Sequence, residues 1–410
     1  MKLFKGLTPV VTAISLLVAL SAWLPGAKAA GQPSSAPIGR EFFGMHMHRA
    51  ATSTPWPEVP FGSWRLWDAY VAWPYLEPTK GQWHFEALDR LVSLAEQNDV
   101  EVLLPLGLTP AWASARPGES SSYKKPGWAA EPRSIEDWRN YVRAVATRYK
   151  GRIRHYEIWN EPNLKGFFSG SVDQMLLLTR EASLIIKQVD PAAVIVSPAA
   201  TGEGDGVKWL DQFLAKGGGR YVDVIGYHFY VTPKPPEAML PLINQVRGVM
   251  TRNNCGGKPL WNTEAGWDQK KRFSDAEAAA YLVRSYLVNW AGGVSRFYWY
   301  AWDSRNWSGL DLTRSDDRSL TPAATAYAEL EKWLTGKRML SCASNDQGVW
   351  ICEIEGSGYK GHILWSPERT GRFQVPRSWG AHQARELTGS AKLLAGGAAL
   401  DLGPVPLLVD

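Results

Sequence analysis

The sequence is poor in cysteine, in excess charge and in repeated segments. Three cysteines in 410 residues are too few for a fold that rests on many disulfides. No internal repeat is visible, and "AGQPSSAP" is the one low-complexity linker, which argues against a solenoid or a string of short modules. A chain of this length, 45% hydrophobic, can instead bury a sizeable core, so a globular fold is expected.

The first 29 residues are typical of a secretory signal peptide. Lys2 and Lys5 precede the short apolar stretch "VVTAISLLVAL", and "GAKAA" follows with small residues at Ala27 and Ala29. An uncleaved anchor helix is the alternative reading. Cleavage would remove three lysines and no acid, which leaves the basic residues nearly balanced by 40 acidic ones. We therefore expect a periplasmic or secreted protein without stable membrane insertion, and charge gives no reason to expect a nucleic-acid partner.

Export to an oxidising compartment would allow the cysteines to form a disulfide. Cys342 and Cys352 flank "ASNDQGVWI", whose Asn, Asp and Gly favour a turn, so the sequence predicts a disulfide across a hairpin. Two buried free thiols are the alternative. Cys255 would then remain unpaired, and nothing in the sequence sets the oligomeric state.

Short runs rich in β-branched and aromatic residues alternate with amphipathic helical stretches. The eight runs are residues 42–48, 63–68, 100–107, 152–163, 193–200, 222–230, 258–267 and 295–303. Between them, Ser134 is a helix N-cap with Gly151 as the stop, and Ser274 with Glu277 forms a capping box. Eight strands alternating with helices predict a (β/α)8 TIM barrel over residues 30–336 rather than a doubly wound sheet.

The end of the chain has a different pattern. After Trp333, "TGK" closes the last helix, and strand-and-turn segments follow without helical periodicity. We predict a small β-sandwich over residues 337–410, packed on the barrel. Residues 31–42 are a candidate for an additional strand in it.

Two glutamates end two of the predicted strands. "RHYEIWNEPN" begins as a buried strand and is stopped by Pro162, which biases Glu161 towards an extended conformation. "KPLWNTEAGW" likewise runs from an apolar start to Glu264, before a turn at Gly266. Because active sites of such barrels lie at the carboxyl ends of the strands, both carboxyl groups are expected at one cleft. A carboxyl pair across a cleft is what glycoside hydrolysis requires.

At this point a family resemblance can be stated. "EIWNEPN" and "WNTEAGW" resemble the fourth-strand acid/base and seventh-strand nucleophile motifs of clan A glycoside hydrolases, and the chain most resembles family 39 and its bacterial exopolysaccharide-hydrolase branch. The resemblance implies a retaining double displacement without cofactor or metal. Glu161 is then the acid/base, Glu264 the nucleophile, and Asn160 bonds the sugar hydroxyl beside the reacting carbon. Glu161 must hold a proton near neutral pH while Glu264 stays ionised.

The export signal and the aromatic-rich loops favour endo action on a polysaccharide, such as a bacterial exopolysaccharide. An exo-acting β-glycosidase such as a β-xylosidase is the alternative. In either case the expected partner is a glycan substrate.

Supporting residues follow from the same resemblance. His228 and Tyr230 end the sixth run, where similar enzymes place a His and a Tyr against the acid/base and the nucleophile. Arg65 could hold Glu264 ionised through its charge, although Asp68 could equally bind this arginine.

Aromatic and histidine side chains are further candidates for substrate binding. Trp302 ends the eighth run and could form an apolar floor under a sugar ring. In the resembling clan a cis peptide often follows such a tryptophan, here the bond to Asp303. Residues expected to line the mouth are His48, Trp112, Trp267 and Trp307.

Two other functions are compatible with parts of the pattern. His46 and His48 in "HMH", with His228 and Asp303, resemble the metal site of barrel amidohydrolases. Against this, the fifth run offers no histidine and the fourth no lysine that could bridge two metals. A glycan-binding barrel without catalysis is the second alternative, and the presence of both glutamates argues against it.

Overall fold

The computed structural model describes residues 36–410 except 269, 271, 306, 307 and 317. The predicted signal peptide and Trp307 lie outside this part of the chain. Among the described residues, no helix has the length and the apolar composition needed to cross a bilayer.

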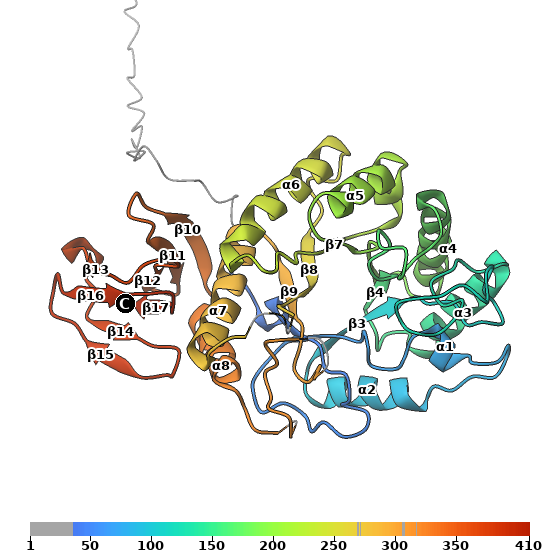
Figure 1. Ribbon diagram of the computed structural model, residues 1–410, viewed down its shortest axis with the longest axis horizontal. Coiled ribbons are helices and arrows are strands. Elements are labelled where there is room, and N and C mark those ends of the chain that lie inside the picture. Colours follow the sequence, from blue (N-terminus) through green and yellow to red (C-terminus); the bar gives the residue numbers. More distant parts are fainter. Residues whose placement is uncertain (1–35, 269, 271, 306–307, 317) are drawn as a thin grey trace, which may run out of the picture.

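The larger domain is built around a curled sheet of nine parallel strands (Figure 1). These strands are β1 (Phe43–Met45), β2 (Ser63–Arg65), β3 (Glu101–Leu106), β4 (His155–Ile158), β5 (Val194–Val196), β6 (Ala200–Thr201), β7 (Ile225–His228), β8 (Leu260–Ala265) and β9 (Arg296–Trp299). The sheet order is β5-β4-β3-β2-β1-β9-β8-β7-β6. The end strands β5 and β6 come from one predicted run, and Val196 at the end of β5 bridges Val224 just before β7. The ring therefore closes, and the predicted TIM barrel is confirmed.

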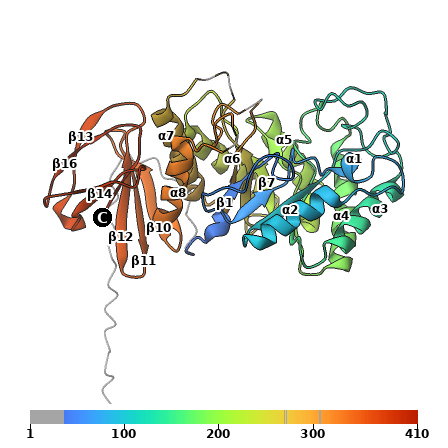
Figure 2. The same ribbon diagram turned by 90° about the horizontal axis from the view of Figure 1, so that it is seen from below.

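Helices surround this sheet (Figures 1 and 2). They are α1 (Trp73–Leu76), α2 (Glu86–Gln97), α3 (Ile135–Arg148), α4 (Val172–Val189), α5 (Asp205–Ala215), α6 (Met239–Arg252), α7 (Asp275–Ala291) and α8 (Pro322–Leu334), with 3-10 turns η1 (Arg40–Phe42), η2 (Gly218–Tyr221) and η3 (Pro236–Ala238). The predicted caps form: Ser134 accepts a hydrogen bond from the amide of Glu136, and Ser274 with Glu277 makes the capping box.

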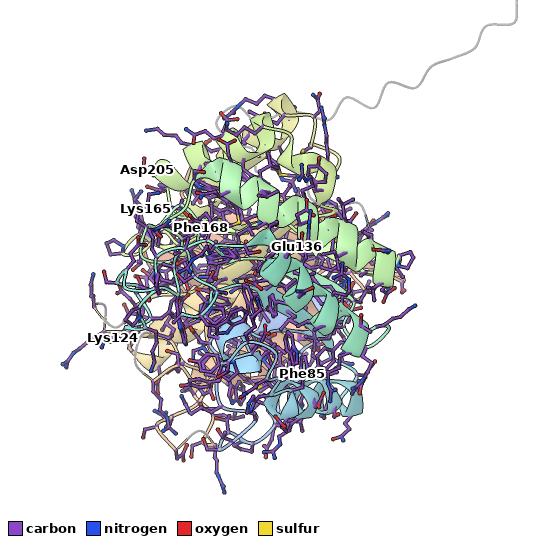
Figure 3. All side chains as sticks on the ribbon, turned by 90° about the vertical axis from the view of Figure 1, so that its right-hand side faces the viewer. Phe85, Lys124, Glu136, Lys165, Phe168 and Asp205 are labelled. Carbon is purple, nitrogen blue, oxygen red and sulfur yellow. A yellow bond between two sulfur atoms is a disulfide. The ribbon has the colours of Figure 1, made fainter. Side chains whose placement is uncertain are left out.

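The helices are amphipathic, with one side against the barrel and the other in solvent. In α3 the buried side chains include Trp138, Tyr141 and Val145, which repeat at helical spacing. Figure 3 looks at this side of the barrel and shows the helices in the outer layer, with the exposed Lys124, Lys165 and Asp205 labelled among the segments around them.

The C-terminal part is an antiparallel β domain beside α7 and α8 (Figure 2). Its strands are β10 (Arg338–Ser344), β11 (Trp350–Gly356), β12 (Tyr359–Trp365), β13 (Gly371–Gln374), β14 (Gln383–Arg385), β15 (Ala391–Leu393), β16 (Ala399–Leu402) and β17 (Leu407–Val409), with the turn η4 (Arg377–Trp379). Six of them form a sheet in the order β10-β11-β12-β17-β14-β15, and β13 pairs with β16.

The predicted N-terminal strand of this domain is absent from residues 36–42. Residues Arg40–Phe42 form the turn η1, and Phe43 continues into barrel strand β1. The segment still lies at the junction, because Ile38 exchanges backbone hydrogen bonds with Gly336 and Lys337.

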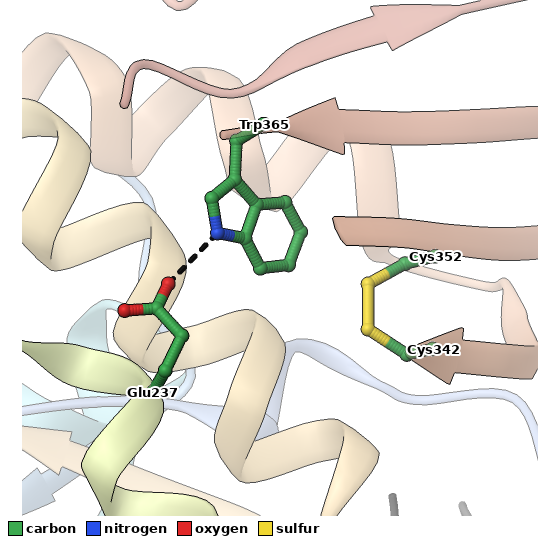
Figure 4. The surroundings of a disulfide bond; sticks show 4 residues. All are labelled: Glu237, Cys342, Cys352 and Trp365. Carbon is green, nitrogen blue, oxygen red and sulfur yellow. Dashed lines mark hydrogen bonds between the residues drawn. A yellow bond between two sulfur atoms is a disulfide. The ribbon is translucent and has the colours of Figure 1, made fainter. Parts of the chain in front are cut away.

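Cys342 and Cys352 face each other on β10 and β11 and form the predicted disulfide (Figure 4). Cys255 is buried and unpaired, as expected. Figure 4 also shows how the β domain contacts the barrel: the indole Nε1 of Trp365 donates a 2.8 Å hydrogen bond to Glu237 in η3.

Candidate active site

The chain turns sharply where β4 ends, and this turn presents the first glutamate. Trp159 and Glu161 have φ of +63° and +46°, in the left-handed region that residues other than glycine rarely adopt. The extended conformation predicted for Glu161 is therefore wrong. Two left-handed residues flank Asn160 and break the alternation of the strand, which allows Asn160 and Glu161 to reach the same site. Such strain persists only where the surroundings impose it, and it is typical of functional positions.

Glu161 and Glu264 are close together and largely removed from solvent. One carboxylate oxygen of each and a ring nitrogen of His228 all lie within 4.8 Å of one another. Each glutamate is 7% exposed. The two predicted strand ends therefore meet at one cleft, as the sequence indicated.

Arg65, at the end of β2, binds three partners through its guanidinium. Nε donates to Glu157 at 2.6 Å, Nη1 to Glu264 at 2.7 Å and Nη2 to the side-chain oxygen of Asn160 at 2.7 Å. The side chain is fully buried, so its charge is little screened by water. Its partners are thus Glu157 and Glu264 rather than Asp68, and it fixes Asn160 as well.

His228 and Tyr230 contact the two glutamates in the predicted way. Nδ1 of His228 lies 3.0 Å from Oε1 of Glu161, and the hydroxyl of Tyr230 donates to Glu264 at 2.9 Å. Burial lowers the pKa of His228 to about 4, so its ring is neutral at neutral pH. A neutral ring with hydrogen on Nδ1 donates to Glu161.

The electrostatics favour one proton on this pair of carboxyl groups. Burial raises the pKa of both Glu161 and Glu264 to about 7. They differ in their direct partners, because Glu264 accepts from the charged Arg65 and from Tyr230, whereas Glu161 faces the neutral ring of His228. These partners favour the ionised form at Glu264 and the protonated form at Glu161.

A cavity of about 230 Å³ opens beside this pair. It is lined by His48, Arg49, Leu66, Trp67, Asp68, Ala69, Tyr70, Val71, Ala72, Tyr75, Leu108, Tyr123, Trp128, Tyr300 and Ser304. His48 was expected at the mouth and lies there. Asp68 accepts a 2.8 Å hydrogen bond from the hydroxyl of Tyr300, which fixes one wall.

Three of the four tryptophans expected at the mouth do not line this cavity, and the fourth, Trp307, lies outside the described residues. Trp302 is 2% exposed and packs in the core, away from the cavity lining. Trp112 packs on Trp73 and bonds the backbone of Glu77, and Trp267 is buried.

The cis peptide expected after Trp302 lies two residues earlier, between Tyr300 and Ala301. Tyr300, the residue after β9, lines the cavity where Trp302 was expected to do so. Trp302 packs its apolar ring in the core and not against a sugar.

The amidohydrolase reading is not supported by the positions of its residues. Nε2 of His46 lies 3.1 Å from the backbone oxygen of Thr263, and Asp303 accepts hydrogen bonds from the amide of His48 and the hydroxyl of Thr54. Within the described chain, one group of carboxylate and histidine side chains is close enough to share a metal ion: Glu161, His228 and Glu264. This group contains the acid pair and does not include His46, His48 or Asp303.

Sequence reasoning missed Glu157 and Tyr300. Glu157 precedes Glu161 by four residues on the same strand run, so its charge was visible but its partner Arg65, on another strand, was not. Tyr300 stands within the eighth run, but Trp302, at the end of that run, was expected to contact the sugar instead. The lining residue Tyr123 lies in a long loop that carries no motif.

Comparisons with known proteins agree with this geometry. The model of glycosyl hydrolases family 39 matches residues 75–290. A β-xylosidase of Geobacillus stearothermophilus is 24% identical over 208 residues, which are 44% of this chain and 40% of that protein. A β-xylosidase of Caldicellulosiruptor saccharolyticus is 31% identical over 32% of this chain and 30% of its own length. The matched segment thus spans less than half of each of these relatives.

Solved structures share the fold over nearly the whole chain. A family 39 glycoside hydrolase from Bacteroides cellulosilyticus has a TM-score of 0.72 at 20% identity, with 91% of this chain and 82% of that one covered. A monomeric β-xylosidase from Caulobacter crescentus has a TM-score of 0.67 at 19% identity, with 92% and 97% covered.

Proposed function

The chain belongs to glycosyl hydrolases family 39, and from this membership and its site we propose that it hydrolyses β-glycosidic bonds with retention of configuration. The observation that carries the proposal is the close approach of Glu161 and Glu264, whose carboxylate oxygens lie within 4.8 Å. Carboxyl groups about 5 Å apart serve a retaining enzyme, whereas an inverting enzyme needs room for a water between them.

The first step uses the difference between the two glutamates. The ionised Glu264 attacks the anomeric carbon while Arg65 and Tyr230 hold its two oxygens in place. The bond between that carbon and the leaving oxygen breaks, and Glu161 gives its proton to this oxygen. The products of the step are a free alcohol and a sugar joined to Glu264 by an ester bond.

The second step reverses the roles. Glu161, now a carboxylate, removes a proton from water, and the water oxygen attacks the anomeric carbon. The ester bond breaks, Glu264 leaves as a carboxylate, and Glu161 is protonated again. Two inversions give net retention. The neutral His228 beside Glu161 accommodates both charge states of this carboxyl group without adding a charge of its own.

We propose β-xylosides as the first substrates to test. The relatives described above are β-xylosidases, and an endo-1,4-β-xylanase of Paenibacillus barcinonensis is 26% identical over 46% of this chain. None of these names points to an exopolysaccharide, so hydrolysis of a bacterial exopolysaccharide follows as the second candidate. Export remains our prediction, and the disulfide between Cys342 and Cys352 is consistent with an oxidising compartment.

The test separates the two glutamates by the configuration of their azide products. In Glu264→Ala, turnover of 4-nitrophenyl β-xyloside should be almost abolished, and added azide enters from the vacated side to give a glycosyl azide of inverted configuration. In Glu161→Ala, this substrate can still form the ester because 4-nitrophenolate leaves without protonation, and azide then gives the retained product.

The matched control is Glu368→Ala, which removes an exposed glutamate of the β domain and should behave as the wild type. Identical azide products from the two site variants would overturn the assigned roles. Wild-type protein that binds xylo-oligosaccharides without cleaving them would support the non-catalytic barrel instead.

A further inference from the structure

The cavity beside the acid pair is a separate compartment. Its lining comes from the segments that follow β1, β2, β3 and β9, and it includes neither Glu161 nor Glu264. The reacting sugar must lie between the two glutamates, since Glu264 bonds to its anomeric carbon and Glu161 gives a proton to the oxygen that leaves that carbon. A cavity of about 230 Å³ next to that position has the size of one further sugar ring rather than of a chain.

The position of Glu161 indicates which side of the reacting sugar the cavity serves. Its carboxyl group contacts His228 of β7 and is influenced by a hydrogen bond from Thr201 of β6. The leaving group must lie against Glu161, hence on the β6 and β7 side of the mouth. The cavity lies on the opposite side, over β1, β2, β3 and β9, so it faces the part of the substrate that stays attached to the reacting sugar.

The cavity has an aromatic wall that continues to the surface. Successive ring centroids are 5.9 Å apart for Trp67 and Tyr123, 6.3 Å for Tyr123 and Trp128, 5.3 Å for Trp128 and Tyr75, and 5.6 Å for Tyr75 and Tyr70. Tyr70 is 58% exposed and Tyr75 38%. Aromatic faces of this kind bind the apolar C–H faces of sugars, and Tyr adds a polar end.

The backbone that carries this wall is strained. Asp68 and Tyr70 have φ of +57° and +60°, although neither is glycine. The hydrogen bond from Tyr300 to Asp68 holds the first of them in place. Left-handed residues other than glycine are unfavourable and cluster at ligand sites, so a strained segment that exposes an aromatic ring points to binding.

Two polar atoms of the lining also lack partners. Nε2 of His48 and the hydroxyl of Tyr123 are buried and make no hydrogen bond within the described chain. Burial of an unpaired polar atom is unfavourable unless a ligand supplies the partner. Sugar hydroxyl groups both donate and accept, so they can satisfy both atoms.

We propose that this cavity binds a second sugar ring, the one that precedes the reacting sugar, and that the enzyme therefore cleaves within glycan chains rather than removing terminal single sugars. This inference rests on the proposed glycosidase function. The wall from Trp67 to Tyr70 then extends the binding surface towards longer chains.

The experiment compares 4-nitrophenyl β-xyloside with 4-nitrophenyl β-1,4-xylobioside, which adds one sugar on the cavity side. Wild-type enzyme should have a kcat/KM about tenfold higher on the xylobioside and should release xylobiose intact. The ratio of the two kcat/KM values should fall about tenfold in Tyr75→Ala. It should stay at the wild-type value in the control Leu184→Ala, which truncates an exposed side chain on α4.

Each outcome decides a different point. A ratio at or below one in the wild type, release of single xylose units from the xylobioside, or an unchanged ratio in Tyr75→Ala would overturn the second subsite while leaving the glycosidase intact. Hydrolysis of neither compound would instead remove the proposed β-xylosidic function, and the inference with it.

Discussion

Two buried arginines in this molecule, Arg65 and Arg284, differ in the balance of charge around them. Arg65, at the mouth of the barrel, faces two carboxylates, Glu157 and Glu264, with Glu161 close by. Arg284 on α7, equally buried, faces the single carboxylate of Glu237 at the contact with the β domain. At the mouth these carboxyl groups outnumber the single guanidinium, so a proton on one carboxyl group reduces the excess of negative charge. At the domain contact the charges match, and no proton is required.

The comparison teaches that burial of an ion pair does not by itself indicate function. Removing two charges from water is costly, and matched partners only offset that cost. A buried carboxyl group without a matching cation is less stable when ionised, so its pKa is raised. A raised pKa is what a general acid needs. The excess of acid around Arg65 therefore marks the active site more specifically than the presence of a buried salt bridge does.

The largest expected effects come from removing each arginine. Arg65→Met leaves Glu157 and Glu264 buried without a cation, and Arg284→Met does the same to Glu237. Both should lower the free energy of unfolding by about 3–5 kcal/mol. Only Arg65→Met should also reduce kcat/KM of the folded enzyme, by about 10²- to 10³-fold, because it removes a charge that acts on the reacting groups.

Urea unfolding and kinetics on 4-nitrophenyl β-xyloside check this pair. An Arg284→Met enzyme that loses as much activity per folded molecule as Arg65→Met would erase the distinction between the two clusters.

The second prediction concerns pH and Glu161. Its pKa is about 7 in the folded protein, against roughly 4.3 in an unfolded chain. Between these values the folded state binds more protons at this group than the unfolded state does, so the stability that Glu161 contributes is fully present below about pH 4 and is lost as pH rises through about 7. This group should account for a loss of roughly 2–3 kcal/mol across that window.

Glu161→Gln should remove that part of the pH dependence, which chemical unfolding at several pH values measures. The wild-type rate should also decline as pH rises through about 7, where the general acid loses its proton. Glu237→Gln is the comparison variant, and the same pH slope as the wild type is expected because its charge is matched by Arg284. A wild-type slope in Glu161→Gln would contradict the placement of the proton.

Much of the barrel could be predicted from the sequence because its signals are local. The eight runs, the capping residues around Ser134 and Ser274, and the two glutamates at strand ends each lie within a short segment. The hydrogen bonds of Arg65 to Glu157 and Glu264 could not be predicted, because these partners come from β4 and β8. The closed sheet brings the two strands near Arg65, and no short segment of the sequence encodes this arrangement.

The errors were also physical in origin. Pro162 was expected to extend Glu161, whereas the left-handed turn at Trp159 and Glu161 is set by tertiary contacts. Trp302 was expected at the mouth because it ends the eighth run, but its ring packs in the core and Tyr300 lines the cavity. Period and residue type identify the strand end, while the choice between neighbouring side chains depends on packing.

The smallest expected effect is at the domain contact. Trp365→Phe keeps an aromatic ring but removes the N–H that donates to Glu237, so the free energy of unfolding should fall by about 1–2 kcal/mol, as for hydrogen bonds to charged groups. In a double-mutant cycle with Glu237→Gln, the coupling should be about 1 kcal/mol, and kcat/KM should change little. Glu237, in η3, follows Tyr230 by seven residues, so a large loss of activity would mean that the β domain positions this tyrosine and that the two clusters are not independent. Zero coupling would instead mean that the hydrogen bond from Trp365 to Glu237 contributes nothing to the contact between the domains.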